Sequence, residues 1–224
     1  MAAKKATLDA RRDRIVAIRH AIDERRRAKI SELATVVPIQ QPWVAHCVNA
    51  VKARDAIVVN ELGVPFDYLE FEEQGCYFSG DAAGGLGSAL GLSLGAKLAA
   101  PDRQVIAITG DGSYMFGNPL PAHFVGRARK LPTLTIICNN SMWNAVKNAT
   151  MAMYPDGLAS RANSLPLVDL TPSPKFEKIV ESVDGYGECV TDPAALKGAI
   201  ERGLDAVAKG VPAVLNVITG AGRG

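Results

Sequence analysis

The sequence predicts an α/β fold: a doubly wound parallel sheet with helices on both faces, preceded by an N-terminal helical arm. Short, continuously apolar runs occur at residues 56–59, 104–109, 133–138 and 213–218. Segments with helical patterning alternate with them, at residues 85–99, 119–130, 143–152, 175–182 and 193–209. β-Rich runs separated by helices indicate parallel strands, and unbroken apolar character indicates strands that are buried on both faces.

The first segment of the chain differs from the rest. Residues 1–37 are predicted to form a helical arm or linker, and residues 38–224 to form the folded domain. A helix over residues 7–34 would carry only a thin apolar stripe, made by Ile15, Ile18 and Ile22. Pro38 and Pro42 end the pattern, and residues 42–52 are predicted to form a short helix. The run Arg25-Arg26-Arg27 is typical of a solvated helix face, and the arm could also dock onto a partner chain.

Length and composition exclude several classes of protein. The 224 residues are 48% hydrophobic with a net charge of +2, which is enough for one sizeable core and gives no general attraction to nucleic acid or membranes. The basic N-terminal stretch lacks the interleaved aromatic residues typical of nucleic-acid binding. The four cysteines are too far apart for a typical zinc site. With no apolar leader or membrane-length run, we expect a cytoplasmic protein.

Polar residues follow the apolar runs and indicate where a ligand would bind. The first strand ends with Asn60 and Glu61, the second with Gly110-Asp111-Gly112-Ser113, and the third with Asn139-Asn140. In doubly wound sheets, ligands bind at the carboxyl ends of the strands. These three strand ends are therefore the candidate site.

One interpretation of this pattern is a nicotinamide-dependent oxidoreductase. Gly85-Leu86-Gly87 would open the dinucleotide-binding helix, and Asp111 would bind a ribose. The match is imperfect, because the third glycine of the fingerprint falls on Leu90 and Gly91 comes one residue late. This interpretation also leaves the glycines beside Asp111 and the asparagine pair without a role.

A magnesium site explains more of these residues. Asp111 would supply a carboxylate, Asn140 an amide oxygen and Met142 a backbone carbonyl, all of which are ligands that Mg²⁺ accepts. Oxygens of a diphosphate and a water would complete the octahedron. Gly110 and Gly112 are expected to let the backbone turn tightly and approach the diphosphate, towards which the amides of Gly112 and Ser113 would point.

The spacing of these residues resembles a known motif. Gly110-Asp111-Gly112-Ser113, followed just under thirty residues later by Asn139-Asn140, is similar to the thiamine diphosphate motif. The stretch "AAGGLGSALGLSLGAKLAAPDRQVIAITGDGSYMF" and the strand "DAIVVNE" extend the likeness over roughly residues 36–219. The chain resembles the diphosphate-binding, C-terminal domain of the thiamine diphosphate-dependent decarboxylase and acetohydroxyacid synthase family.

This resemblance implies two cofactors, thiamine diphosphate and Mg²⁺, and a set of binding residues. Mg²⁺ would be held by Asp111, Asn140 and the Met142 carbonyl. The cofactor would contact Gly84, Gly85, Leu86, Gly110, Asp111, Gly112, Ser113, Asn140, Met142 and Trp143. Within this set, Gly84 would accept from the aminopyrimidine, Leu86 would lie under the thiazolium ring and Trp143 would shape the substrate pocket.

Some positions depart from the family pattern or invite no catalytic role. Gly63 and Val64 fall where some relatives carry hydroxyls near the diphosphate, so side-chain contacts are not expected there. His123, at the start of a helix, is interpreted as a packing or surface residue. No catalytic residue of this chain is predicted with certainty. In the family, the catalytic glutamate lies in a separate pyrimidine-binding domain, and 224 residues are too few for all three family domains.

The resemblance therefore implies a split enzyme. A second chain would carry the pyrimidine-binding and middle domains, in a hetero-oligomer built on dimers. The substrate would be a 2-oxo acid or a 2-hydroxyacyl compound, and the reaction a decarboxylation, a carbon–carbon lyase step or an acetolactate synthase-like carboligation. The alternatives are a non-catalytic cofactor-binding subunit and, with less support, the nicotinamide-dependent oxidoreductase. Neither nucleic acid nor a membrane is an expected partner.

Overall fold

The protein is built on one six-stranded, fully parallel sheet, which confirms the predicted α/β fold. The computed structural model describes residues 2–80, 85–162, 165 and 167–220. The strand order is β2-β1-β3-β4-β6-β5. The strands are β1 (Ile57–Glu61), β2 (Tyr77–Ser79), β3 (Val105–Gly110), β4 (Leu134–Asn139), β5 (Tyr186–Val190) and β6 (Ala213–Ile218). The four central strands are almost entirely buried because helices cover both faces.

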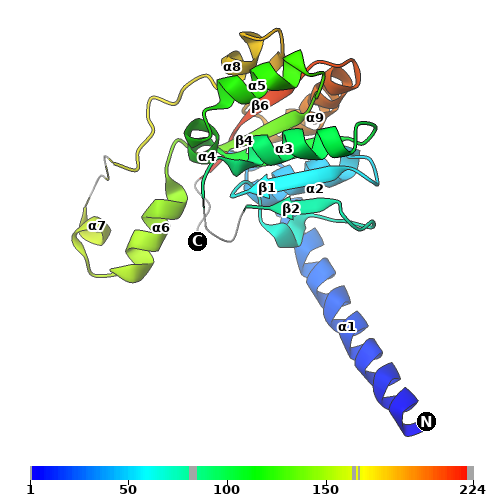
Figure 1. Cartoon of the computed structure of the whole chain (residues 1–224). Coiled ribbons are helices and arrows are strands. Elements are labelled where there is room, and N and C mark those ends of the chain that lie inside the picture. The colour runs from blue at the N-terminus through cyan, green and yellow to red at the C-terminus, as the bar shows by residue number, and fades with distance from the viewer. Residues whose placement is uncertain (1, 81–84, 163–164, 166, 221–224) are drawn as a thin grey trace.

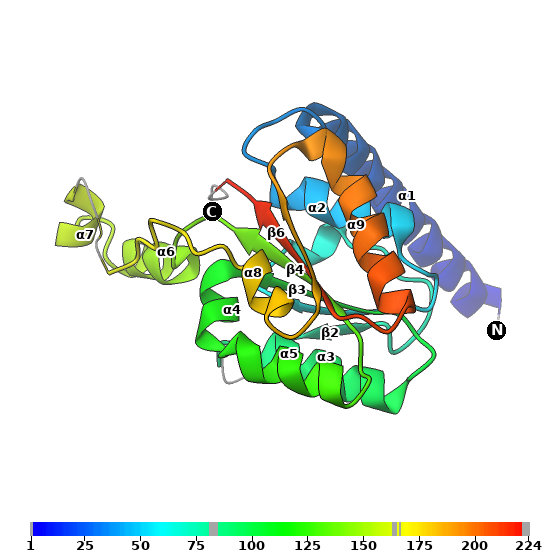
Figure 2. The same cartoon turned by 90° about the horizontal axis from the view of Figure 1, so that it is seen from above.

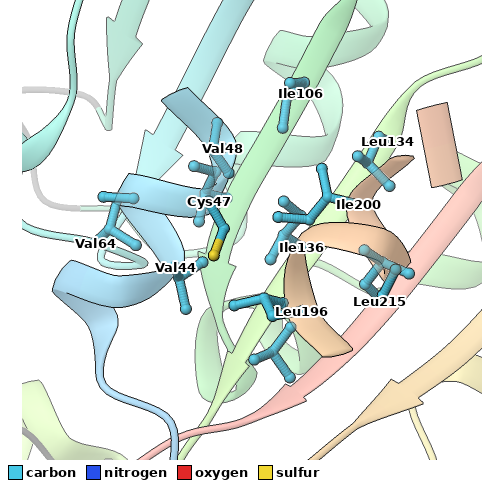
Figure 3. Packing of buried hydrophobic residues seen from close by; sticks show 14 of the residues in the cluster. Val44, Cys47, Val48, Val64, Ile106, Leu134, Ile136, Leu196, Ile200 and Leu215 are labelled. Carbon is cyan, nitrogen blue, oxygen red and sulfur yellow. The ribbon is translucent and has the colours of Figure 1, made fainter. Parts of the chain in front are cut away.

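One face of the sheet is covered by α2 (Gln41–Val51) and α9 (Pro193–Ala208). Figure 3 shows the core between these helices and the sheet. Val44 and Val48 of α2 and Ile200 of α9 meet side chains from the strands, such as Ile106 and Ile136. This is the largest apolar cluster among the described residues, and it makes the sheet a rigid support for the strand ends.

The opposite face is covered by α3 (Ser88–Ala99), α4 (Asp111–Phe116), α5 (Pro119–Ala128) and α8 (Glu177–Glu181) (Figure 2). Alternate strand residues point to this face. Ile137 packs with Tyr114 and Phe176, while Val59 packs with Ala89. The sheet is therefore doubly wound, and its carboxyl edge lies between two layers of helices.

Two helical segments extend away from this body. Figure 1 shows α1 (Ala2–Leu33) pointing outwards on one side, and α6 (Asn144–Met153) with α7 (Leu158–Arg161) on the other. Leu33, at the end of α1, is buried, whereas Ile15 and Ile18 are exposed. No helix among the described residues combines the length and apolarity needed to cross a bilayer.

The structure adds elements that the periodicity did not predict. The two edge strands β2 and β5 and the short helix α4 were not expected, and neither were α7 and the single turn η1 (Phe66–Tyr68). Both edge strands are only partly buried, so they lack the continuous apolar run used to find the other four. The remaining predicted elements agree with the structure to within a few residues, except that the first helix starts at Ala2.

Candidate active site

A pocket of about 490 Å³ opens at the carboxyl ends of β3 and β4. Its walls bring together eight residues that the sequence singled out: Leu86, Gly110, Asp111, Gly112, Ser113, Asn140, Met142 and Trp143. The further lining comes mostly from α6. Residues far apart in the chain meet here because parallel strands end at the same edge of the sheet.

Asp111 is the first residue of α4 and is only 2% exposed. Its Oδ2 accepts a hydrogen bond from the Met142 amide over 3.2 Å, which joins the ends of β3 and β4. Burial raises the pKa of the Asp111 carboxyl, and backbone amides from Gly112 and Met142 oppose that rise. A buried carboxylate with no basic side chain beside it, among the described residues that line the pocket, favours a bound cation nearby.

Asn140 carries a buried polar atom that nothing in the chain satisfies. Its Oδ1 has no hydrogen-bond partner among the described residues, although it is shielded from solvent. The Met142 carbonyl accepts a hydrogen bond from Asn144 over 2.8 Å and keeps a second lone pair. A carboxylate, an amide oxygen and a carbonyl are hard oxygen donors, and this set suits Mg²⁺. The residues present therefore fit the predicted cation.

Asn139 and Asn140 have different environments, although they are adjacent in the sequence. Asn139 is 1% exposed, and its Nδ2 donates to Ser173 and Asn216 over 2.8 and 3.0 Å. Its Oδ1 accepts from the Ser141 amide over 3.0 Å. Asn139 is thus fully used within the protein, whereas Asn140 Oδ1 remains available to a ligand.

The glycines beside Asp111 do not form the tight turn that was expected. Gly110 has an ordinary extended backbone, with φ −75° and ψ 156°, and Gly112 lies within the α4 helix, so neither makes a tight left-handed turn. A Cβ on Gly112 would lie 2.7 Å from the ring of Trp143. A Cβ on Gly110 would meet only the Leu62 carbonyl, at 3.6 Å. Gly112 therefore makes room for Trp143, and Gly110 leaves open space in the pocket.

A second pocket of about 400 Å³ adjoins the first at Leu62 and Leu86, which line both. Gly85 lines this second pocket and does not line the first. Gly84 lies outside the described residues. Leu62 was not predicted as a site residue; its φ of 55° is unusual for a leucine and indicates local strain beside the site.

Glu61, which ends β1, has a structural role. Its carboxylate accepts from the amides of Gly87 and Ala89 over 2.5 and 2.6 Å, and so caps the start of α3. Gly63 packs against β3 so closely that a Cβ would lie 2.7 Å from Ile108 Cγ2. The backbone at Gly63 thus leaves no room for a side chain, in agreement with the expectation of no side-chain contact there.

His123 lies in the core and away from the pocket. It is 5% exposed, and its Nε2 pairs with the Tyr114 hydroxyl over 2.8 Å. Burial lowers its pKa to about 4. This agrees with the packing role expected for it.

Another depression, of about 560 Å³, lies at the opposite, amino-terminal edge of the sheet and is lined by several basic residues. Lys97 donates there to the carbonyls of Pro101 and Arg103 over 2.7 and 2.8 Å. Basic groups near helix C-termini balance the helix dipole and satisfy free carbonyls. We therefore place the candidate site at the carboxyl edge, where polar atoms remain unpaired.

The fold and the pocket together define a class: an α/β cofactor-binding domain with oxygen donors at its strand ends. Comparison with known proteins gives the family. The family described as "Thiamine pyrophosphate enzyme, C-terminal TPP binding domain" matches residues 63–217. The chain belongs to this thiamine pyrophosphate enzyme family.

Individual relatives agree with this assignment. The chain is 32% identical over 191 residues to a probable acetolactate synthase of Mycobacterium bovis, covering 82% of this chain and 32% of the relative. It is 37% identical over 114 residues to a benzoylformate decarboxylase of Pseudomonas aeruginosa, covering 49% and 21% of the two chains. The solved 4-hydroxybenzoylformate decarboxylase of Rhodococcus jostii RHA1, which is thiamine diphosphate-dependent, superposes with a TM-score of 0.70 at 28% identity.

The chain spans only part of these proteins. It covers 32% of the acetolactate synthase and 33% of the solved decarboxylase, while those matches cover 82% and 83% of this chain. The similarity thus concerns one domain of each relative.

Proposed function

We propose that this chain is a subunit of a split thiamine diphosphate-dependent enzyme and contributes the half of the active site that binds the diphosphate and Mg²⁺. The observation that carries the proposal is the buried, unpartnered Oδ1 of Asn140 in the same pocket wall as Asp111. Such an atom costs about 1–3 kcal/mol unless a ligand satisfies it. Membership of the thiamine pyrophosphate enzyme family supplies the cofactor.

In this proposal, seven residues of the pocket have specific roles. Asp111, Asn140 and the Met142 carbonyl hold Mg²⁺, and the amides of Gly112 and Ser113 bind diphosphate oxygens. Leu86 and Trp143 form apolar walls that orient the rings and exclude water. When bound, thiamine diphosphate supplies a nucleophilic carbon and an electron sink, which suit cleavage or formation of a bond beside a carbonyl.

The substrate we propose is a 2-oxo acid or a 2-hydroxyacyl compound. Relatives named acetolactate synthase, benzoylformate decarboxylase and 2-hydroxyacyl-CoA lyase support this range. The reaction is a decarboxylation, a lyase step or an acetolactate synthase-like carboligation. We place it in the cytoplasm.

The proposed partner chain carries the pyrimidine-binding and middle domains, in a hetero-oligomer built on dimers. In this proposal, residues 38–224 form the diphosphate-binding domain and residues 1–37 the arm. Two observations support a partner. The chain spans about a third of its relatives' length. Among the residues that line the larger pocket, Asp111 carries the only carboxyl group, and Glu61 in the adjoining pocket is committed to capping α3.

Native mass spectrometry of the untagged chain, purified from its own host with thiamine diphosphate and Mg²⁺, tests the proposal. We expect a larger second chain to co-purify, and turnover of 2-oxo acids to require both chains. Full turnover by the purified chain alone would contradict the split enzyme. Cofactor binding in the complex without turnover of any such substrate would instead indicate a non-catalytic subunit.

A further inference from the structure

A buried chain of polar side chains lies behind the loop that carries Asn140. It runs from Glu177 at the start of α8, through Asn216 on β6, to Asn139 at the end of β4. The three residues are 7%, 3% and 1% exposed. Asn216 Nδ2 donates to Glu177 Oε2 over 2.8 Å, and Asn139 Nδ2 donates to Asn216 Oδ1 over 3.0 Å. We call Glu177, Asn216 and Asn139 the polar relay.

The relay has a direction, which its first member sets. A carboxylate can only accept hydrogen bonds, so Asn216 must turn its amide nitrogen towards Glu177. Its oxygen then faces Asn139, which must donate in turn. The Asn139 oxygen is thereby left to face the loop. An asparagine amide could otherwise lie in either of two flipped orientations.

The Asn139 oxygen holds a strained turn. It accepts from the Ser141 amide over 3.0 Å, and Ser141 has a left-handed backbone with φ 55°. Non-glycine residues adopt this conformation only where surrounding contacts enforce it. The Ser141 carbonyl accepts from Leu170 over 2.9 Å, and the next amide, of Met142, donates to Asp111. The turn thus sets the position of Asn140 relative to Asp111.

We propose that Glu177 and Asn216 are positioning residues for the cation site, because their fixed hydrogen-bond direction makes Asn139 hold the Ser141 turn and with it Asn140. This inference rests on the proposed function, since it assigns the turn to Mg²⁺ binding. Neither residue lines the pocket, so both act through Asn139. Outer partners of metal ligands typically contribute about 10–100-fold to metal affinity.

Two substitutions of similar volume separate the hydrogen-bond acceptor at position 177 from packing. Glu177→Gln keeps an acceptor oxygen for Asn216, whereas Glu177→Met keeps the volume and removes the acceptor. Asn216→Leu, of similar volume, removes both the donor to Glu177 and the acceptor for Asn139. Thr135→Val is the matched control, because Thr135 is a buried residue of β4 whose Oγ1 has no partner among the described residues. Thermal unfolding first establishes that each variant is folded.

The readout is Mg²⁺ affinity of the full chain at saturating thiamine diphosphate, followed by the fluorescence of Trp143. A Trp43→Phe background leaves Trp143 as the sole tryptophan of the two in the sequence. We expect Glu177→Met and Asn216→Leu to weaken Mg²⁺ binding about 10–100-fold, and Glu177→Gln and Thr135→Val about threefold or less. Equal affinities for the Met and Gln variants would overturn the inference.

Exchange of the Ser141 amide, measured by NMR without cofactor, reports on the relay directly. Protection of the Ser141 amide from hydrogen exchange should fall in Glu177→Met and persist in Glu177→Gln. Unchanged protection in Glu177→Met would overturn the inference. If the Trp43→Phe chain without further substitution shows no Mg²⁺ response with thiamine diphosphate, either alone or with its co-purifying partner, the proposed function itself fails. If the Mg²⁺ response is present but identical in the Glu177→Met and Glu177→Gln variants, the inference about the polar relay is wrong and the proposed function is unaffected.

Discussion

Single atoms distinguish the roles of neighbouring residues at this site. Asn139 and Asn140 follow one another at the end of β4, yet the first has four polar contacts within the protein and the oxygen of the second has none. Gly110 and Gly112 flank the same aspartate, but only Gly112 is required by a neighbouring side chain. Residue type alone would have made each pair equivalent.

Alanine at the two glycines should therefore have different effects. Gly112→Ala pushes a Cβ into the Trp143 ring at 2.7 Å. Overpacking costs about 1–3 kcal/mol, which exceeds the helix-propensity gain of about 1 kcal/mol. We expect a net loss of about 1 kcal/mol in the free energy of unfolding, measured in urea, and a changed Trp143 fluorescence.

Gly110→Ala is the companion variant, because its Cβ would have space in the protein. Its unfolding free energy should change by less than about 1 kcal/mol. If the diphosphate lies against Gly110, as the sequence leads us to expect, thiamine diphosphate affinity should fall about tenfold or more, equivalent to roughly 1.4 kcal/mol. Unaltered calorimetric affinity would argue against a diphosphate at this position.

The burial of His123 leads us to expect that the free energy of unfolding depends on pH. Its pKa in the folded protein is lowered from 6.5 to about 4, so the unfolded chain binds the proton first as pH falls. The stability that is present above pH 6.5 should be lost progressively towards pH 4, by up to about 3 kcal/mol from this group. His123→Gln keeps an acceptor for Tyr114. In this variant, the free energy of unfolding measured in urea should depend less steeply on pH between pH 6.5 and pH 4. His20→Gln, on exposed α1, is the control and should retain the dependence.

At the scale of elements, the sheet was predictable and its edges were not. The four central strands carry continuous apolar runs because both of their faces are buried. The edge strands β2 and β5 are short and partly exposed, so their composition does not distinguish them from loops. The helix α4 was missed because Gly110 and Gly112 suggested a turn, whereas the chain enters a helix directly at Asp111.

The junction between β1 and α3 depends on one carboxylate. Glu61→Gln would place an amide group against two backbone donors that now bond to Glu61. Hydrogen bonds to a charged group contribute about 1.5–3 kcal/mol each. We expect the free energy of unfolding to fall by about 2 kcal/mol in urea. Glu72→Gln, in an exposed pair with Arg54, should cost less than about 1 kcal/mol; an equal cost in both variants would contradict the capping role.

At the scale of the whole molecule, the arm and the body are largely independent. The side chains of α1 are exposed from residue 5 to residue 21, whereas Ile22, Asp23 and Arg26 are partly buried and Leu33 is buried. Deleting residues 2–18 should therefore shift the thermal midpoint of the isolated chain by no more than about 3 °C, measured by calorimetry. A larger loss would show that the arm stabilises the domain. If the deletion leaves association with a partner chain intact, the arm is not the docking element.

The sequence by itself determined the fold class of this protein, its family through the resemblance to the thiamine diphosphate motif, and half of the residues that line the pocket. The polar residues of the pocket were predictable because buried parallel strands require continuous apolar runs, and polar residues at their ends are then forced together at one edge. Only the tertiary structure decided which polar atoms are free. Asn139 is consumed by Asn216 and Ser173, which are distant in the sequence, and Glu61 by the start of α3. Such pairings depend on three-dimensional packing, because a hydrogen bond is satisfied by proximity and direction and leaves no periodic trace in the chain.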